Sequence, residues 1–283
     1  MSDPVHQLGE RFARERYFAD EGLLTAVHLA LTLGRPLALE GEPGVGKTEV
    51  AKVLASVLGR ELVRLQCYEG LDAAQALYEW DYPRQLLHVR TCEAEGRPVG
   101  SLYDEAFLLE RPLLRALRGP VVLLIDEIDR ADSEFEAFLL EFLSDFQITI
   151  PELGTVAATE PPVVVMTSNR TRELHDALKR RCLYHWIPFP EAERERRIVG
   201  ARAPGVDEAA AAALVEAVTN ARGLKLLKRP GIAESIEWAQ GAHVLAEEGA
   251  AWPDALRRSL GLLLKEQDDV ETALAHAELL GLT

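Results

Sequence analysis

The sequence is short of cysteine, of basic residues and of long apolar runs. Its 283 residues include only three cysteines, Cys67, Cys92 and Cys182, which are too few and too scattered for a disulfide framework. We therefore expect a reducing, cytoplasmic location. No apolar stretch approaches the ~18 residues that a membrane-spanning helix needs, and residues 1–10 lack the apolar core of a signal peptide. The sequence thus predicts neither a membrane span nor a secretion signal.

Basic residues are outnumbered by acidic ones, 31 against 46, which gives a formal net charge of −15 at pH 7. Proteins whose main task is to hold nucleic acid usually carry a basic face, so nucleic acid is a disfavoured partner. The composition is otherwise that of a globular protein, with 48% hydrophobic and 27% charged residues. Such a chain can bury a sizeable core without metals or disulfides.

Short apolar runs alternate with helical patterns in the first two thirds of the chain. Four runs predict buried strands, and two periodic segments predict helices; the strands are residues 36–39, 61–66, 121–125 and 163–167, and the helices are residues 21–33 and 48–58. This alternation is typical of a doubly wound α/β domain with a parallel sheet. Between residues 146 and 158, a turn around Pro151 separates two strand-like segments and predicts a β-hairpin.

The pattern becomes wholly helical after residue 191. Helices are predicted at residues 191–201, 206–222, 231–248 and 252–265. We therefore divide the chain into an α/β domain at residues 1–192 and a helical lid domain at residues 193–283.

The strongest motif follows the first predicted strand. Gly41-Glu42-Pro43-Gly44-Val45-Gly46-Lys47-Thr48 fits G-x-x-x-x-G-K-[ST] at every fixed position, and a helix is predicted directly after it. The glycines let backbone N–H groups surround phosphate oxygens at a helix N-terminus. Lys47 would reach the β- and γ-phosphates of ATP, and the Thr48 hydroxyl would bind Mg²⁺. All eight residues are therefore predicted to bind the nucleotide.

The partner of that motif is an apolar strand that ends in two carboxylates. In Leu123-Leu124-Ile125-Asp126-Glu127, Asp126 would hold Mg²⁺ through water, and Glu127 would orient and polarise the attacking water. Together with Lys47 and Thr48, this strand end predicts ATP hydrolysis.

Three further sites are less specific. Asn169 ends the next apolar strand, where it would bind the γ-phosphate or the attacking water, or else cap a helix at residues 171–178. Arg180 and Arg181 close that helix; one of them would reach the nucleotide of a neighbouring subunit, or both would only complement the helix dipole. In the lid domain Lys228 and Arg229 precede a helix. One of this pair, provisionally Arg229, would contact the bound γ-phosphate.

Two Cys/His pairs, His88 with Cys92 and Cys182 with His185, have the helical spacing that zinc ligands can have. Neither segment contains a second pair, so we assign these residues to the core or the surface.

Taken together, the motifs resemble those of the AAA+ ATPases, and the resemblance covers nearly the whole chain. The order of phosphate loop, acidic strand end, polar Asn, Arg pair and helical lid is that of the superfamily. The hairpin around Pro151, before the Asn169 strand, is similar to the pre-sensor hairpin of the MoxR branch. Residues 77–82 (Leu-Tyr-Glu-Trp-Asp-Tyr) and 228–234 (Lys-Arg-Pro-Gly-Ile-Ala-Glu) look most like the CoxD-like subgroup. One difference is at the lid, where many MoxR members have Ser-Pro-Arg and this chain has Lys228-Arg229-Pro230.

The resemblance implies function as well as fold. Members of this branch are chaperones that form homo-hexameric rings and work with a partner that carries a von Willebrand factor A domain. The CoxD-like subgroup is associated with maturation of molybdenum hydroxylases such as carbon monoxide dehydrogenase, which implies metal-cofactor insertion. ATP and Mg²⁺ would be the cofactors.

Three other functions compete with a remodelling chaperone. A P-loop kinase would have no evident use for the Asn strand, the Arg pair or the lid. A DNA-directed AAA+ motor is disfavoured by the acidic charge. A scaffold that binds nucleotide without hydrolysing it is disfavoured by Glu127.

Overall fold

The computed structural model describes residues 3–283, and these divide into two compact units. One unit, here called the sheet unit, consists of residues 25–40 and 51–185. The other, here called the helical unit, consists of the residues up to Leu24, residues 41–50 and residues 186–283. The phosphate loop therefore belongs to the helical unit, whereas the acidic strand end belongs to the sheet unit.

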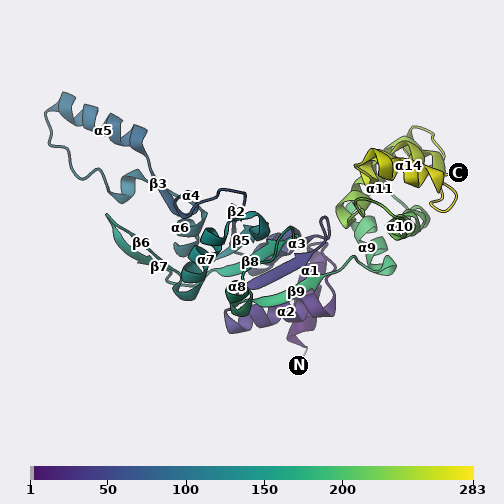
Figure 1. Cartoon of the computed structure of the whole chain (residues 1–283), viewed down its shortest axis with the longest axis horizontal. Helices are drawn as coiled ribbons and strands as arrows, with labels where there is room; N and C mark the ends of the chain where they lie inside the picture. The colour runs from purple at the N-terminus through teal and green to yellow at the C-terminus, as the bar shows by residue number, and fades with distance from the viewer. Residues whose placement is uncertain (1–2) are drawn as a thin grey trace. The chain divides into compact units, whose positions relative to one another are not determined.

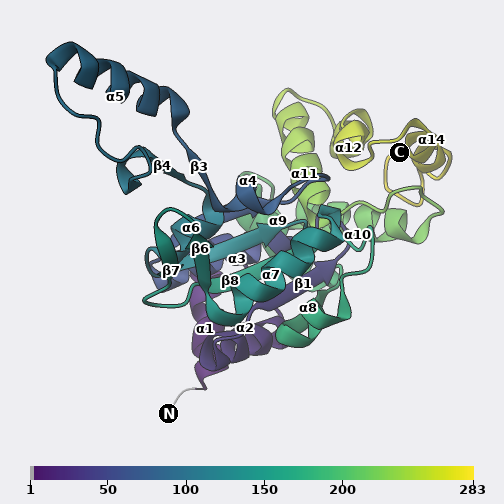
Figure 2. The same cartoon turned by 60° about the vertical axis from the view of Figure 1, so that its left-hand side comes forward.

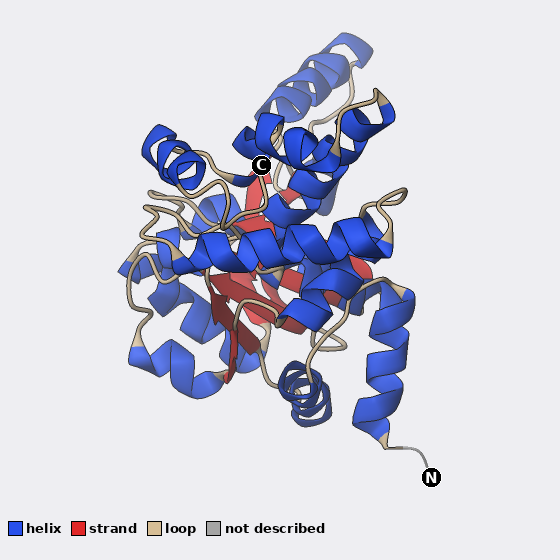
Figure 3. Ribbon diagram, turned by 90° about the vertical axis from the view of Figure 1, so that its right-hand side faces the viewer, coloured by secondary structure: helices blue, strands red, loops and turns tan. Residues whose placement is uncertain are grey.

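The sheet unit is built on a five-stranded sheet with strand order β2-β5-β8-β1-β9. Its strands β2, β5, β8 and β1 are paired in parallel, as the sequence predicted. Figure 3 shows the strands in red with helices around them. The strands, in chain order, are β1 (Leu37–Gly41), β2 (Glu61–Gln66), β3 (Tyr78–Trp80), β4 (Leu108–Glu110), β5 (Val121–Asp126), β6 (Gln147–Ile150), β7 (Gly154–Ala157), β8 (Val163–Ser168) and β9 (Leu183–Ile187).

The helices that lie wholly or mostly in the sheet unit are interleaved with these strands. They are α2 (Glu21–Leu33), α3 (Lys47–Leu58), α4 (Ala73–Leu77), α5 (Tyr82–Glu95), α6 (Pro112–Leu117), α7 (Ser133–Asp145) and α8 (Asp176–Arg181), with two short 3-10 turns, η1 (Glu105–Phe107) and η2 (Ile128–Arg130).

Both faces of the central strand β5 are buried, which explains its unbroken aliphatic sequence. Leu123 and Ile125 belong to a core cluster with Phe135 and Leu139 of α7, which lies across the sheet in Figure 2. The alternate residues, such as Leu124, point to the other face and are also fully buried. The fold is therefore doubly wound, as predicted.

Two extensions project from this unit in Figure 1. The first is the hairpin of β6 and β7, in which Ile150 pairs with Gly154, so the hairpin predicted around Pro151 is confirmed. The second, not predicted, is α5 on a ribbon made by β3 and β4. Asp81 starts α5 by accepting a hydrogen bond from the Arg84 amide at 3.0 Å, and Gly96 ends it at φ +64°.

The helical unit contains α1 (Pro4–Arg14), α9 (Ala192–Arg202), α10 (Glu208–Gly223), α11 (Ile232–Glu247), α12 (Trp252–Arg258), α13 (Leu260–Leu263) and α14 (Gln267–Ala275). Helices α9 to α14 share a core around Trp238, which is fully buried and donates its indole N–H to the Leu256 carbonyl at 3.0 Å. The helical C-terminal region is thus confirmed, while the boundary at residues 192/193 stays a prediction. None of the helices described in residues 3–283 is both long and apolar enough to cross a membrane.

Some predicted helices were wrong in their limits. The helix predicted at residues 171–178 begins only at Asp176, because Thr171 is held in a loop by its hydrogen bonds to Asp129. The helix predicted at residues 252–265 is interrupted at Ser259 and forms α12 and α13. Helices α1 and α14 were not predicted.

Candidate nucleotide site

The phosphate loop runs from the end of β1 into α3. Gly44 and Gly46 have φ angles of +76° and +91°, a region that side chains with a Cβ rarely adopt. Lys47 is only 7% exposed, and its ammonium donates to the carbonyls of Gly41 and Glu42, both at 2.8 Å. The ammonium of Lys47 thus lies within the loop, where it would form charge-assisted hydrogen bonds with phosphate oxygens.

The loop is hydrogen-bonded to the first turn of the lid helix α11. The amides of Ile232 and Ala233 donate to the Gly44 carbonyl at 3.0 and 3.3 Å. The approach requires glycine on the lid side too, since a Cβ on Gly231 would lie 2.7 Å from the Gly44 Cα. Glu234 closes this turn by accepting from the Gly231 amide at 3.0 Å. Phosphate loop and lid helix are therefore one connected structure within the helical unit.

The segment before α11 is anchored by buried charges. Arg222 binds both carboxylate oxygens of Glu195, at 2.6 and 2.9 Å, and donates to the Pro230 carbonyl at 2.8 Å. Ser235 adds a hydrogen bond to Glu195 at 2.7 Å. Because Glu195 is fully buried, this ion pair anchors the Pro230 carbonyl just before α11.

The two lid cations, Lys228 and Arg229, differ in their contacts. The Lys228 ammonium is paired with Glu266 at 2.7 Å, which raises the pKa of this lysine. Within residues 3–283, Arg229 forms no ion pair or side-chain hydrogen bond, and it is exposed. Arg229 is therefore the more accessible of the two cations, and its contact with the γ-phosphate stays a prediction.

In the sheet unit, Asp126 closes β5 and is 2% exposed. One of its carboxylate oxygens accepts from the Thr167 hydroxyl at 2.5 Å. The other is paired with Arg64 at 2.5 Å. One oxygen of this buried carboxylate is thus paired with a cation.

Glu127 and Asn169 are brought together at the same edge of the sheet. The Asn169 amide nitrogen lies 3.5 Å from the Glu127 carboxylate. Glu127 also accepts from Gln66 at 3.1 Å and is paired with Arg130 at 3.0 Å. Its own backbone has φ +55° and is held by an amide hydrogen bond to Thr167 at 2.9 Å. Strained backbone of this kind is concentrated at functional sites.

Asp129 fixes the loop that carries Asn169. Its carboxylate accepts from the amides of Asn169 and Thr171 at 3.2 and 2.9 Å, and from the Thr171 hydroxyl at 2.7 Å. Burial acts to raise the pKa of Asp129, but these hydrogen bonds outweigh it, and the pKa lies below the ordinary value. The cap of α8 is His175, so the alternative that Asn169 caps this helix is wrong.

Arg180 and Arg181 end α8, as predicted, but only the Arg181 side chain forms hydrogen bonds that the structure describes within the sheet unit. The Arg181 guanidinium donates to the Leu140 carbonyl and to the Ser144 hydroxyl of α7. Within residues 3–283, the exposed Arg180 side chain forms no ion pair or side-chain hydrogen bond. Arg180 is therefore the more accessible of the two, and a contact of this arginine with another subunit stays a prediction.

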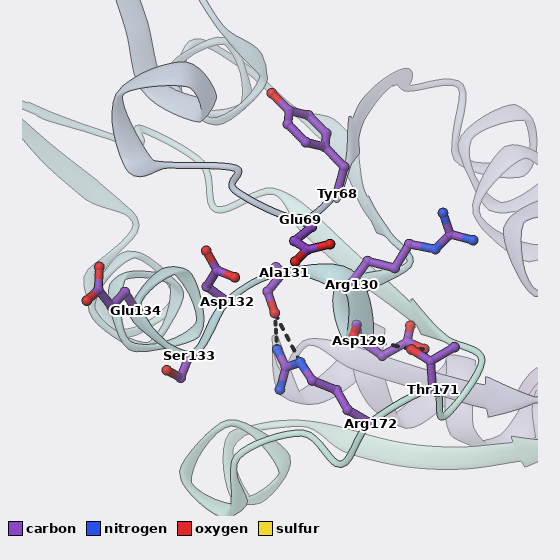
Figure 4. A pocket seen from close by; sticks show the side chains of 10 residues that line it. All are labelled: Tyr68, Glu69, Asp129, Arg130, Ala131, Asp132, Ser133, Glu134, Thr171 and Arg172. Carbon is purple, nitrogen blue, oxygen red and sulfur yellow. Dashed lines mark hydrogen bonds between the residues drawn. The ribbon is translucent and has the colours of Figure 1, made fainter.

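A cavity of about 1010 Å³ opens beside this edge (Figure 4). It is lined by Tyr68, Glu69, Asp129, Arg130, Ala131, Asp132, Ser133, Glu134, Thr171 and Arg172. The Arg172 side chain donates to the Ala131 carbonyl and pairs with buried Glu136. Asp126, Glu127 and Asn169 do not line it, and its carboxylates disfavour an anionic ligand, so this cavity is not a phosphate site.

The sequence reasoning missed Arg64, Gln66, Asp129 and the Glu195–Arg222 pair. The alternating burial of β2 leaves Arg64 and Gln66 on one exposed face, which could have indicated a shared role at the end of the strand. The burial of Glu195 is not visible in the sequence, because its partner Arg222 is 27 positions further along the chain.

The donor set fits magnesium nucleotide. Hydroxyl and carboxylate oxygens, as at Thr48 and Asp126, are the ligands that Mg²⁺ prefers, completed by substrate phosphates. No group of three or more His, Cys, Asp or Glu in residues 3–283 is arranged to hold a metal by itself.

Comparison with known proteins agrees with this geometry. Residues 36–182, slightly more than half of the 283 residues, match the family model described as AAA domain (dynein-related subfamily). The chain belongs to this family. The matched residues contain the phosphate loop, the acidic strand end, Asn169 and the Arg pair.

Similarity to individual proteins supports the same assignment. The chain is 28% identical over 197 residues to Protein NorQ of Paracoccus denitrificans, covering 67% of this chain and 66% of NorQ. It is 28% identical over 181 residues to the uncharacterised protein YehL of Escherichia coli, covering 60% of this chain and 46% of YehL. The chloroplastic chaperone protein ClpB3 of Arabidopsis thaliana is 32% identical over 140 residues, which are 48% of this chain and 13% of ClpB3. The chain thus spans about half to two thirds of the length of YehL and NorQ.

Among solved structures, a mutant RuvB of Thermotoga maritima superposes with a TM-score of 0.55 at 19% identity, covering 94% of this chain and 72% of RuvB. At that identity the likeness concerns the fold alone. Together, the family match and the relatives confirm that the chain is an AAA+ protein of MoxR type. The CoxD-like subgroup stays a prediction.

Proposed function

We propose that this ATPase is a chaperone that converts ATP hydrolysis at its phosphate loop into movement of the lid and so remodels a partner protein complex. The observation that carries the proposal is the pair of hydrogen bonds from the α11 amides to the Gly44 carbonyl. Any change in the loop on phosphate loss acts directly on the lid helix. Because a buried ion pair anchors the preceding segment, the lid domain would move as a rigid body.

In this proposal each site residue has one task. Lys47 and the loop amides of residues 41–48 bind the phosphates, and Thr48 and Asp126 hold Mg²⁺. The metal neutralises charge that develops on the phosphates. Glu127 polarises the attacking water, and Asn169, 3.5 Å away, orients it. Arg229 contacts the γ-phosphate from the lid.

We propose a homo-hexameric ring as the working assembly. A head-to-tail contact that closes on itself places one subunit's Arg180 at the next subunit's nucleotide. The exposed Arg180 side chain, which forms no ion pair within residues 3–283, supports this role.

A partner with a von Willebrand factor A domain and a molybdenum hydroxylase client, such as carbon monoxide dehydrogenase, follow from the CoxD-like resemblance. Helix α5 supports a protein partner in general, because Tyr82, Leu86 and Leu87 are 62%, 55% and 65% exposed on it, and exposed apolar patches mark interaction sites. The three buried, unpaired cysteines support a cytoplasmic location. The acidic charge argues against nucleic acid.

The test is to mature such a hydroxylase in cells that co-express its von Willebrand factor A partner with either the wild type or Lys47→Ala. We expect an active hydroxylase with the wild type alone, and Mg²⁺-ATP should assemble the purified wild type into rings measurable by light scattering. Equal hydroxylase activity with both forms would contradict the proposed client. Monomers at micromolar protein with Mg²⁺-ATP, across salt conditions, would contradict the ring.

A further inference from the structure

Arg64 has no part in the function proposed above, yet it lies at the centre of the acidic strand end. β2 pairs in parallel with β5, and Gln66 is the register partner of Asp126. Side chains two apart on a strand share a face, so Arg64 and Gln66 both point along the edge where Asp126 and Glu127 lie.

One guanidinium nitrogen of Arg64 contacts the Asp126 carboxylate directly and the Glu127 carboxylate indirectly. It lies 2.5 Å from Asp126 Oδ2 and 2.5 Å from Gln66 Oε1. Gln66 in turn donates from Nε2 to Glu127 Oε2 at 3.1 Å. Arg64 thus binds Asp126 directly and Glu127 through Gln66.

The charge balance at this edge requires a cation. The Asp126 side chain is 3% exposed, and a buried carboxylate without a counter-charge is costly. Arg64 is paired with Asp126, and Arg130 is paired with Glu127.

Arg64 is also free to leave. Its side chain is 51% exposed. Because the guanidinium is already partly hydrated, its movement into water changes its solvation little. A half-exposed arginine on a buried aspartate is a contact that another cation can displace.

We propose that Arg64 is the resident counter-cation of the metal site: it neutralises Asp126 and orients Gln66 while the site holds no metal, and it leaves Asp126 when Mg²⁺ binds with nucleotide. This rests on the proposed function, in which Asp126 holds Mg²⁺. Arg64 is a positioning residue that acts through Asp126 and Gln66.

Competition of this kind has a measurable sign. When a ligand must displace an existing contact, its apparent affinity is its intrinsic affinity multiplied by the fraction of protein in which that contact is open. Arg64→Gln removes the competitor, so metal should bind about five- to tenfold more tightly. A residue that only shaped the site would weaken metal binding when removed.

The experiment is a titration of the full chain with Mn²⁺ in saturating ADP, followed by electron paramagnetic resonance. We expect the dissociation constant of Mn²⁺ to fall about five- to tenfold in Arg64→Gln. Arg60→Gln is the matched control, because Arg60 lies just before β2, pairs with Glu160 and carries the same charge. The control should bind Mn²⁺ as the wild type does.

A second readout separates competition from general loss of structure. In EDTA, Arg64→Gln should melt at a lower temperature than the wild type because Asp126 has lost its ion pair with Arg64, and Mg²⁺-ADP should remove this difference. Arg64→Lys keeps the charge but loses the guanidinium nitrogen that contacts both Asp126 and Gln66, so it should bind Mn²⁺ about two- to threefold more tightly. It provides the test if Arg64→Gln does not fold.

Several results would overturn the proposal. Unchanged or weaker Mn²⁺ binding in Arg64→Gln, or in a folded Arg64→Lys when that variant replaces it, would do so. So would an equal gain in Arg60→Gln, which would reduce the effect to net charge. If Mn²⁺ binding by the wild type does not depend on nucleotide, the proposed function itself fails. If the wild type binds Mn²⁺ with nucleotide but Arg64→Gln binds it equally well, only the role of Arg64 fails.

Discussion

Gly231→Ala tests the contact on which the proposed coupling depends. Gly231 has φ −84° and ψ −176°, a conformation that alanine adopts freely, so the backbone itself is not strained. The added methyl would instead meet the Gly44 Cα and the Pro43 carbonyl, each at 2.7 Å. The lid helix must therefore move away from the phosphate loop, and the hydrogen bonds of Ile232 and Ala233 to Gly44 must lengthen or break.

The size of the effect follows from two contributions. Forcing a methyl into a packed site costs ~1–3 kcal/mol, and each lost hydrogen bond costs ~0.5–1.5 kcal/mol. We take ~2 kcal/mol as the loss in the local opening free energy, which corresponds to about 30-fold faster exchange at ~1.4 kcal/mol per tenfold. Gly261→Ala is the matched control, since a Cβ there meets nothing within 4 Å.

The assay is amide hydrogen exchange of residues 232–233, with and without Mg²⁺-ATP. The wild type should show protected amides whose exchange depends on nucleotide. Gly231→Ala should lose about 30-fold in protection and most of the nucleotide response, while Gly261→Ala should behave as the wild type. Unchanged protection in a folded Gly231→Ala protein would refute the steric argument. An unchanged nucleotide response would refute the coupling.

Three further predictions concern the Arg pair and Asp129. Arg180→Ala should keep the wild-type melting temperature and ATP affinity but lose ~10³-fold or more in hydrolysis, as for an arginine that acts across an interface. Mixing Arg180→Ala subunits with Lys47→Ala subunits should restore part of the activity. If rings that demonstrably contain both variants recover no activity, the role of Arg180 is structural. Arg181→Ala should melt ~2–4 °C lower, since the loss of its bonds to Leu140 and Ser144 costs ~1 kcal/mol; an unchanged melting temperature would contradict that role. The folded pKa of Asp129 lies below its ordinary 3.8, so its stabilisation is complete above that value and is lost as the pH falls through the folded pKa; urea unfolding should show Asp129→Asn less stable at pH 7, with a gap that closes in acid, and a constant gap would count against it.

The parts of the site that the sequence predicted are those set by local pattern. The phosphate loop needs glycines at fixed spacing, and Asp126 needs only its place after an aliphatic strand, so both were visible in a few consecutive residues. The parallel sheet followed from the alternation of strands and helices.

The parts that were missed depend on residues far apart in the chain. Arg64 and Asp126 are 62 positions apart, and Gly44 and Gly231, whose backbones approach each other, are separated by more of the chain still. The helix predicted at residues 171–178 failed because Asp129 captures Thr171, which no local propensity could indicate. Helix α5 was missed because it carries exposed Leu86 and Leu87 beside buried Gln85, the reverse of the usual amphipathic pattern.

The most direct test of the central claim, that Glu127 drives ATP hydrolysis at this phosphate loop, is phosphate release from Mg²⁺-ATP by the wild type and by Glu127→Gln, with ATP affinity measured in parallel. The glutamine keeps the shape of the side chain but cannot polarise water. We predict wild-type ATP affinity and a loss of ~10²-fold or more in turnover for Glu127→Gln. Turnover near that of the wild type, with ATP still bound, would contradict the account.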